Sequence, residues 1–332
     1  MAQPAVNSSR RFSLRIVIAF VLVVVGGAGT WLYVDSARGV GGCKAFLDDK
    51  RVRAALGVEY EPDLSCAELG AAIKRVTTGP TTGKHSLKQA RSMQNLLAAM
   101  DDWTSGRDGG VDTDLAVPFS EALADYSADT YQILSSVNVD YIRRDASSTS
   151  PWQDGDGVHM SVSQESMLRV MRALSESPVA YATARESITQ DVAAQFAETP
   201  RTAGKDRLSL VTKLSARVLG ALDAVAEKAE AASGDRKRWD GEVITHLTQN
   251  AVEIPPYAKD PVGHLVQTWK QKLRTNADGE SVFTSLLESQ STEMTNSWSA
   301  GLGLGHDLSS SLMDDSRDSA YSGRSAALRQ LE

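Results

Sequence analysis

The chain has 332 residues, 42% of them hydrophobic, and a formal net charge of −7 at pH 7. This apolar content is sufficient for a packed core, either in one large domain or in two small ones. The negative charge argues against nucleic acid and against an anionic membrane surface as partners, because both attract basic surfaces.

The first predicted element is a transmembrane helix at residues 16–34, with the sequence IVIAFVLVVVGGAGTWLYV. The segment is uncharged, and a helix of this length spans about 28 Å, close to the roughly 30 Å hydrocarbon core of a bilayer. The residues expected to anchor it are Ile16, Phe20 and Val25 in the apolar core and Trp31 and Tyr33 at the outer interface. The lipid bilayer is therefore a predicted partner of this segment.

The orientation of the segment follows from its basic flank. Arg10, Arg11 and Arg15 precede it, and no acidic residue does. Because Lys and Arg stay on the cytoplasmic side, we expect residues 1–15 to be cytoplasmic and the chain after residue 34 to be extracytoplasmic. The predicted location is the cell membrane, crossed once.

Three other interpretations of this segment stay open. Residues 27–29 form a poor small-x-small site, at which a secretory signal peptide would be cleaved. Residues 9–15 resemble a twin-arginine export motif, although Ser13 stands where that motif has Phe. Residues 40–43 resemble a lipoprotein box, although charged residues separate them from the apolar run. The basic flank and the uninterrupted apolar length favour the uncleaved anchor.

Cys43 and Cys66 are the only two cysteines of the chain. An even number of cysteines in an extracytoplasmic segment predicts one disulfide, and two unpaired buried thiols are the alternative. The bond would follow a Gly-rich juncture at residues 35–42. It would join two short helices, at 43–56 and 66–76, into a hairpin next to the membrane.

The region 43–300 is predicted to be helical, because its apolar residues recur every three or four positions and no stretch alternates as a β-strand does. The predicted fold class is all-α: a single N-terminal transmembrane helix followed by an extracytoplasmic multi-helix bundle. A boundary between two domains would fall at 147–160 or at 197–205. Residues 301–332 are rich in Gly, Ser and Asp, and we expect them to form a flexible tail.

Two long helices are predicted within this region. Pro118 opens the first, whose apolar residues continue as far as Tyr141. The second is residues 205–232, and its apolar stripe consists of Leu208, Val211, Val218, Leu222, Val225 and Ala229. A one-sided stripe must be covered, and we expect the helices at 178–197 and 239–252 to cover it. A second copy or a partner protein is the alternative cover.

The loop before residue 160 contains the metal-ligand candidates. Asp154 and Asp156, with Gly157 after them and His159 close by, echo part of a calcium-binding loop. The loop lacks the third oxygen ligand and the later Glu that such a loop requires. Because Asp-Gly pairs are turn formers, we expect a turn here, and a weak cation site is the alternative.

Two longer runs carry a resemblance. The first is YIRRDA at 141–146 with SMLRVMRALSESPVAYATARESITQDVA at 166–193, and the second is GALDAVAEKAEAASGDRKRWDGEVITHLTQNAV at 220–252. Together they resemble large helical proteins of actinobacteria that are associated with secreted WXG-type helical proteins. The resemblance covers about half of the chain. It implies an envelope or secretion-related helical domain and carries over no catalytic residues.

The chain contains no recognisable enzyme motif. Its five histidines are not at metal-binding spacing, and no Gly-x-Ser-x-Gly turn is present. No catalytic residue, cofactor-binding residue or cofactor is therefore predicted. The expected function is that of a membrane-anchored interaction or scaffold component of the cell envelope, which binds another envelope protein. The alternative is an exported effector or hydrolase with an unrecognised site.

Overall fold

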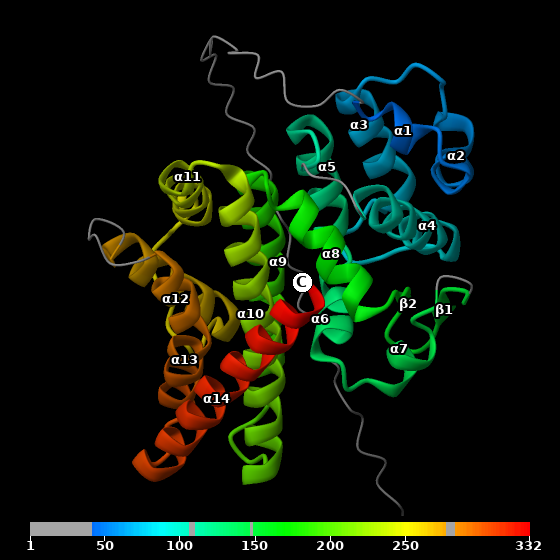
Figure 1. The fold of residues 1–332 in the computed structure, drawn as a ribbon. Coiled ribbons are helices and arrows are strands. Elements are labelled where there is room, and N and C mark those ends of the chain that lie inside the picture. Colours follow the sequence, from blue (N-terminus) through cyan, green and yellow to red (C-terminus); the bar gives the residue numbers. More distant parts are fainter. Residues whose placement is uncertain (1–41, 106–109, 147–148, 277–282) are drawn as a thin grey trace, which may run out of the picture. The chain divides into compact units, whose positions relative to one another are not determined.

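The computed structural model describes residues 42–105, 110–146, 149–276 and 283–332. In these ranges the chain forms 14 α-helices, one short 3₁₀ helix and one two-stranded sheet, shown in Figure 1. The helices are α1 (Lys44–Leu47), α2 (Lys50–Leu56), α3 (Cys66–Thr77), α4 (Leu87–Thr104), α5 (Thr113–Ala124), α6 (Ser127–Ser135), α7 (Val139–Arg143), α8 (Gln164–Leu174), α9 (Pro178–Ala197), α10 (Lys205–Ser233), α11 (Arg236–Thr248), α12 (Pro261–Asn276), α13 (Phe283–Gly301) and α14 (His306–Gln330). The other elements are η1 (Gly57–Glu59), β1 (Trp152–Gln153) and β2 (Val158–His159). The prediction of an all-α fold is confirmed.

The predicted transmembrane segment at 16–34 lies outside the described residues. Among the helices that the structure does describe, none combines the length and the apolar character needed to cross a bilayer. The anchor and orientation residues of the N-terminal segment likewise stay predictions.

A disulfide closes the N-terminal part of the described chain. It joins Cys43, the N-cap residue of α1, to Cys66, the first residue of α3, and the two Cα atoms are 5.4 Å apart. A capping box of Ser65 and Glu68 starts α3, which packs on α5. The predicted pairing is confirmed: Cys43 belongs to the hydrophobic core of the described residues, and Cys66 packs against that core.

The prediction of one long helix from Pro118 to Tyr141 is wrong. Asp112 caps α5 instead, and Pro118 lies inside that helix. The chain then breaks at Asp125 and again at Ser136, which has a φ of 58° in the left-handed region. These breaks divide the segment into α5, α6 and α7, because a periodic apolar pattern does not record where the backbone changes direction.

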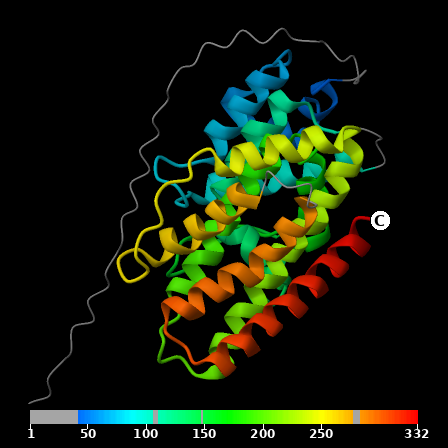
Figure 2. The same cartoon turned by 90° about the vertical axis from the view of Figure 1, so that its left-hand side faces the viewer.

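The helix α10 packs against six other helices: α6, α8, α9, α11, α13 and α14. All six residues of its predicted stripe are buried. The expected covers, α9 and α11, do contact it, but its most extensive partner is α14. Figures 1 and 2 both show α14 running beside α10.

The prediction that residues 301–332 form a flexible tail is wrong. Most of them form the helix α14, which packs against α10 through small residues. The buried residues of α14 are Leu312, Ser316, Ala320, Gly323 and Ala327. A Cβ atom on Gly220 of α10 would lie 2.0 Å from the carbonyl oxygen of Ala320, and a Cβ atom on Gly323 would lie 2.3 Å from that of Arg217. The two backbones are therefore in direct contact, which only glycine at these positions permits.

A buried polar cluster connects α9, α10 and α13. Arg185 of α9 is 0% exposed, and its Nη1 donates to Oδ1 of Asp223 at 2.8 Å and to the hydroxyl of Tyr181 at 2.5 Å. Its Nε and Nη2 donate to Oε1 of Gln290 at 2.9 and 2.7 Å, and Nη2 also donates to the carbonyl of Leu287 at 3.0 Å. Five donors with five contacts satisfy the guanidinium completely, so this charge can lie in the core.

Candidate interaction surface on α7 and the β-hairpin

Four polar side chains meet beneath α7, and we call them the inner clamp: Asp129 from α6, Tyr141 from α7, Asp154 from the hairpin turn and His159 from β2. Nδ1 of His159 lies 2.9 Å from Oδ1 of Asp129 and 3.0 Å from the hydroxyl of Tyr141. Nε2 of the same ring lies 3.0 Å from Oδ1 of Asp154. The Tyr141 hydroxyl donates to Oδ1 of Asp129 at 2.5 Å, and the backbone N–H of Met160 donates to Oδ2 at 3.0 Å.

The charges of the inner clamp follow from this geometry. The hydrogen bond to Asp129, supported by Asp154, raises the pKa of His159 from 6.5 to about 9. The ring is therefore protonated at neutral pH and donates from both nitrogens. Burial raises the pKa of Tyr141, which stays a neutral donor to Asp129. The inner clamp thus joins three segments through charge-assisted hydrogen bonds.

The hairpin turn is built by Asp154, as the sequence predicts. Its Oδ1 accepts the backbone N–H groups of Asp156 at 2.9 Å and of Gly157 at 3.3 Å. The hydrogen bond from Asp156 lowers the pKa of Asp154, so this carboxylate is ionised opposite His159. The strands pair Trp152 with His159, which directs the His159 ring toward α6 and α7.

The three metal-ligand candidates are only partly brought together. The side chains of Asp154 and His159 are in contact. Asp156 contacts Asp154 through its backbone N–H rather than through its carboxylate. In the part of the chain that the structure describes, no three His, Cys, Asp or Glu side chains are grouped as metal ligands. Both nitrogens of His159 donate to carboxylates, which leaves no lone pair for a cation.

The outer surface of α7 is apolar. Val137, Val139 and Ile142 are 46%, 53% and 49% exposed. Val137 precedes the N-cap Asn138 and Ile142 is the fourth helical residue, the two positions of a hydrophobic staple. Val139 and Ile142 are three residues apart and share one side of the helix. We call these three residues the α7 face.

Besides the inner clamp, aromatic and cation–π contacts of Trp152 hold α7 in place. The Trp152 ring meets the Tyr141 ring edge-on at a centroid distance of 4.9 Å. The guanidinium of Arg144 lies 4.9 Å from the centroid of Trp152, a cation–π contact. In residues 136–146 and 149–160, a buried polar cluster thus lies under a helix that exposes three aliphatic side chains.

Two residues of the inner clamp, Asp129 and Tyr141, are absent from the sequence-predicted site. A signal for Asp129 exists: it lies four residues before Ile133 and three after Tyr126, at a core-facing position of α6. A carboxylate at such a position needs a partner. That partner is His159, which lies 30 residues further along the chain and reaches Asp129 only in the folded protein.

Comparisons with known proteins give no family for this chain. No family model, no curated protein and no solved structure matches it. The geometry of the described residues is therefore the basis for the proposals below.

Proposed function

We propose that this chain is a membrane-anchored, extracytoplasmic helical protein that binds another protein of the cell envelope through the α7 face. The observation that carries the proposal is the grouping of exposed aliphatic side chains. Of the eight large hydrophobic residues that are exposed among the described residues, three fall within positions 137–142. Apolar side chains that gather on one surface, rather than scatter singly, mark interaction sites.

The chemistry around the α7 face favours a protein over a lipid surface as the occupant. Asp140, Arg143 and Asp145 are exposed and lie beside the apolar residues in the sequence. An apolar centre with a polar rim of both charges is the usual anatomy of a protein interface. Two aspartates at the rim would be repelled by an anionic bilayer, whereas a partner protein can present a basic group to each of them.

The inner clamp supports the same function by ordering the surface before it binds. A helix of five residues has no stability of its own in water. The hydrogen bonds from Tyr141 and His159 to Asp129 hold α7 and the hairpin in one geometry. A surface that is already ordered loses less conformational entropy on association, which favours affinity.

The hydrolase alternative receives less support from the same cluster. A histidine that acts as a general base needs a ring nitrogen that is free to accept a proton near neutral pH. The pKa of His159 is raised to about 9 by Asp129, and both ring nitrogens already face carboxylates. The inner clamp is therefore better suited to holding the hairpin than to proton transfer.

The extracytoplasmic location rests on the apolar segment 16–34 and on the disulfide, which persists in oxidising compartments. We expect the full chain to stay in the membrane fraction after a high-salt wash, with its C-terminus open to external protease. A soluble product that begins near residue 30 would contradict the anchor.

Site-specific crosslinking tests the α7 face in the native membrane. A photoreactive amino acid is placed at Val139, and a control is placed at Tyr321, which is 71% exposed on α14. We expect one defined crosslinked protein from position 139 and none from 321. Ile142→Asp should abolish that crosslink and leave the melting temperature unchanged. Identical products from the two positions, or a crosslink that survives Ile142→Asp, would refute the proposal.

A further inference from the structure

The charges beside the α7 face are arranged so that this surface complements itself. Asp140 and Arg143 are exposed, lie three residues apart on α7, and form no ion pair with each other or with any other described residue. Opposite charges at this spacing are close enough to pair within one helix. Since no such pair forms, both charges are available to a partner that approaches α7.

The helical geometry places these charges at the border of the apolar residues. Tyr141 is 6% exposed and marks the inward direction of α7. Because successive residues are about 100° apart around a helix, Val139 and Arg143 point most directly outward. Ile142 and Asp140 flank them on opposite sides. The outward surface is therefore aliphatic toward one side and carries two opposite charges toward the other.

An antiparallel copy of α7 presents this surface in the complementary order. A two-fold axis that crosses the helix between positions 141 and 142 brings each residue opposite the one that is equally far from the axis in the other direction. Asp140 then lies opposite Arg143 of the copy, and Arg143 lies opposite Asp140 of the copy. On the aliphatic side, Ile142 lies beside its own counterpart. One alignment thus pairs all four charges and buries apolar surface, as a two-fold symmetric interface requires.

We propose that the α7 face binds a second copy of this chain, so that the protein forms a two-fold symmetric dimer in the membrane. This inference rests on the proposed function, because it names the partner of the same surface. An unrelated protein would have to present an anion and a cation in the reversed order beside an apolar residue. A second copy does so without any further surface, which gives the electrostatic complementarity that selects a partner.

The small size of the surface fits a dimer between anchored chains. The helix α7 has five residues, and its three exposed aliphatic side chains cover far less than the roughly 800 Å² per partner of a stable soluble interface. The proposed anchor at 16–34 would hold two copies in one bilayer and raise their effective concentration, which compensates for a weak contact. We therefore expect dimers in membranes and monomers in dilute detergent solution.

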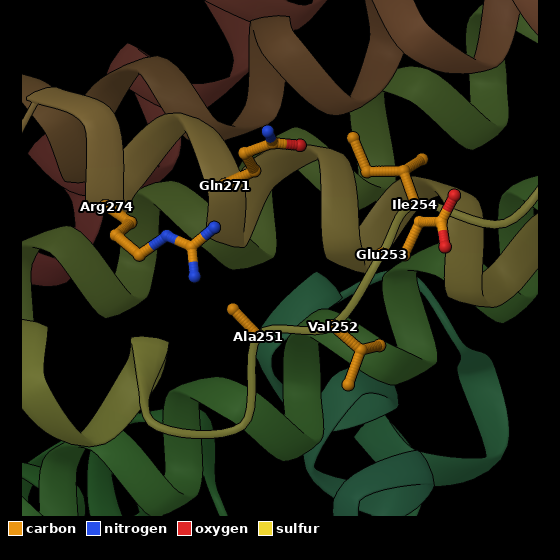
Figure 3. A pocket seen from close by; sticks show the side chains of 6 residues that line it. All are labelled: Ala251, Val252, Glu253, Ile254, Gln271 and Arg274. Carbon is orange, nitrogen blue, oxygen red and sulfur yellow. The ribbon is translucent and has the colours of Figure 1, made fainter.

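A second exposed valine supplies a matched control position. Val252 is 64% exposed and lies in the segment that lines an open pocket of about 340 Å³ beside α12. In Figure 3 its side chain points away from Gln271 and Arg274. Among the residues that line this pocket, Val252 is the one large hydrophobic residue that is exposed. An isolated valine of this kind is ordinary protein surface and gives no interface.

The test is crosslinking of single-cysteine variants of the full chain in phosphatidylcholine vesicles at a low protein-to-lipid ratio. The two native cysteines are joined, so Val139→Cys and Val252→Cys each introduce one free thiol. A short bis-maleimide links two thiols that lie within its reach. We expect on the order of tenfold more crosslinked dimer from Val139→Cys than from Val252→Cys. Adding Ile142→Asp should remove that excess.

Charge exchange tests the pairing itself. Asp140→Arg and Arg143→Asp, each combined with Val139→Cys, should lower the yield of dimer about tenfold, because like charges then meet across the two-fold axis. Mixing the two variants should restore the crosslink between them, since each offers the charge that the other lacks. Loosening of α7 in either variant would not be repaired by mixing, so recovery reports the charge pairing.

Two results would overturn the proposal: equal yields of dimer from positions 139 and 252, and mixed charge variants that fail to crosslink. A third result separates it from the proposed function. In native membranes, a photocrosslink from position 139 to a different protein, without a dimer, would refute the dimer and retain the α7 face as an interaction surface. Absence of both products would refute both proposals.

Discussion

The buried pair of Arg185 and Asp223 makes the strongest stability prediction for this protein. The two side chains are 0% and 3% exposed, so water does not screen them. Among the described residues, Asp223 is the one carboxylate bonded to the guanidinium, so Asp223→Ala leaves the charge with three neutral acceptors, from Tyr181, Leu287 and Gln290. Removing one partner of a buried pair costs about 3–5 kcal/mol, because the remaining charge stays desolvated.

A matched exposed pair gives the control. Arg238 and Glu242 are 2.7 Å apart on α11, and their side chains are 75% and 41% exposed. Because solvent screens this pair, Glu242→Ala should cost about 0.5 kcal/mol or less. Both variants remove one carboxylate from one helix, so their difference isolates the effect of burial.

The assay is thermal unfolding of the full chain in mild detergent, followed by circular dichroism. At about 2.1 cal/mol/K of unfolding entropy per residue, we expect Asp223→Ala to lower the melting temperature of a chain of this size by about 5–8 °C and Glu242→Ala by about 1 °C or less. The double variant Arg185→Met with Asp223→Leu should recover part of the loss, because no buried charge is left unpaired. Equal shifts for the two single variants would refute the reasoning.

Three further predictions concern other parts of the fold. The pKa of His159 is raised in the folded state, so its contribution is complete below pH 6.5 and lost as the pH rises through about 9. The full shift of the His159 pKa corresponds to about 3 kcal/mol of unfolding free energy, and solvent screening of the half-exposed Asp154 carboxylate reduces this to about 1–2 kcal/mol. The difference in unfolding free energy between wild type and His159→Gln should therefore shrink from pH 6 to pH 10. A difference that stays constant over this range would contradict the prediction. Gly220→Val should lower the free energy of unfolding by about 2–3 kcal/mol, because the new Cβ would lie 2.0 Å from the backbone of α14. The control is Gly241→Ala on α11, whose Cβ meets nothing within 4 Å and which should be neutral or stabilising. A neutral Gly220→Val would show that α10 and α14 separate freely. Replacing Cys43 and Cys66 by serine should lower stability by about 3 kcal/mol for a separation of 23 residues, as chemical denaturation would measure, and an unchanged midpoint would show that the loop is ordered without the bond.

The candidate surface shows where sequence reasoning reached its limit. The turn at Asp154 was predictable, because an Asx side chain bonds the N–H groups that follow it within the same few residues. The partners of His159 were not, because Asp129 and Tyr141 reach it only after the chain reverses at Ser136. The same break turns Val137 from an expected core residue into an exposed one.

Local interactions are what the sequence by itself determined. The helix α10 ends where Gly234 adopts a positive φ of 75°, and its apolar stripe is buried as its period requires. The disulfide was predictable because the chain has two cysteines in a segment that we expected to be extracytoplasmic. The end of α10 and its stripe depend on residues that are close in sequence. The disulfide depends on a pairing for which two cysteines leave one possibility.

Contacts between distant helices were decided by the tertiary structure alone. The Gly-, Ser- and Asp-rich composition of residues 301–332 is typical of a disordered tail, because small side chains bury little apolar surface. In the folded chain the same small residues let α14 approach α10 until Gly220 meets Ala320 and Gly323 meets Arg217. A small side chain stabilises a helix only where a second backbone offers a complementary surface, and that surface lies about a hundred residues away in the sequence.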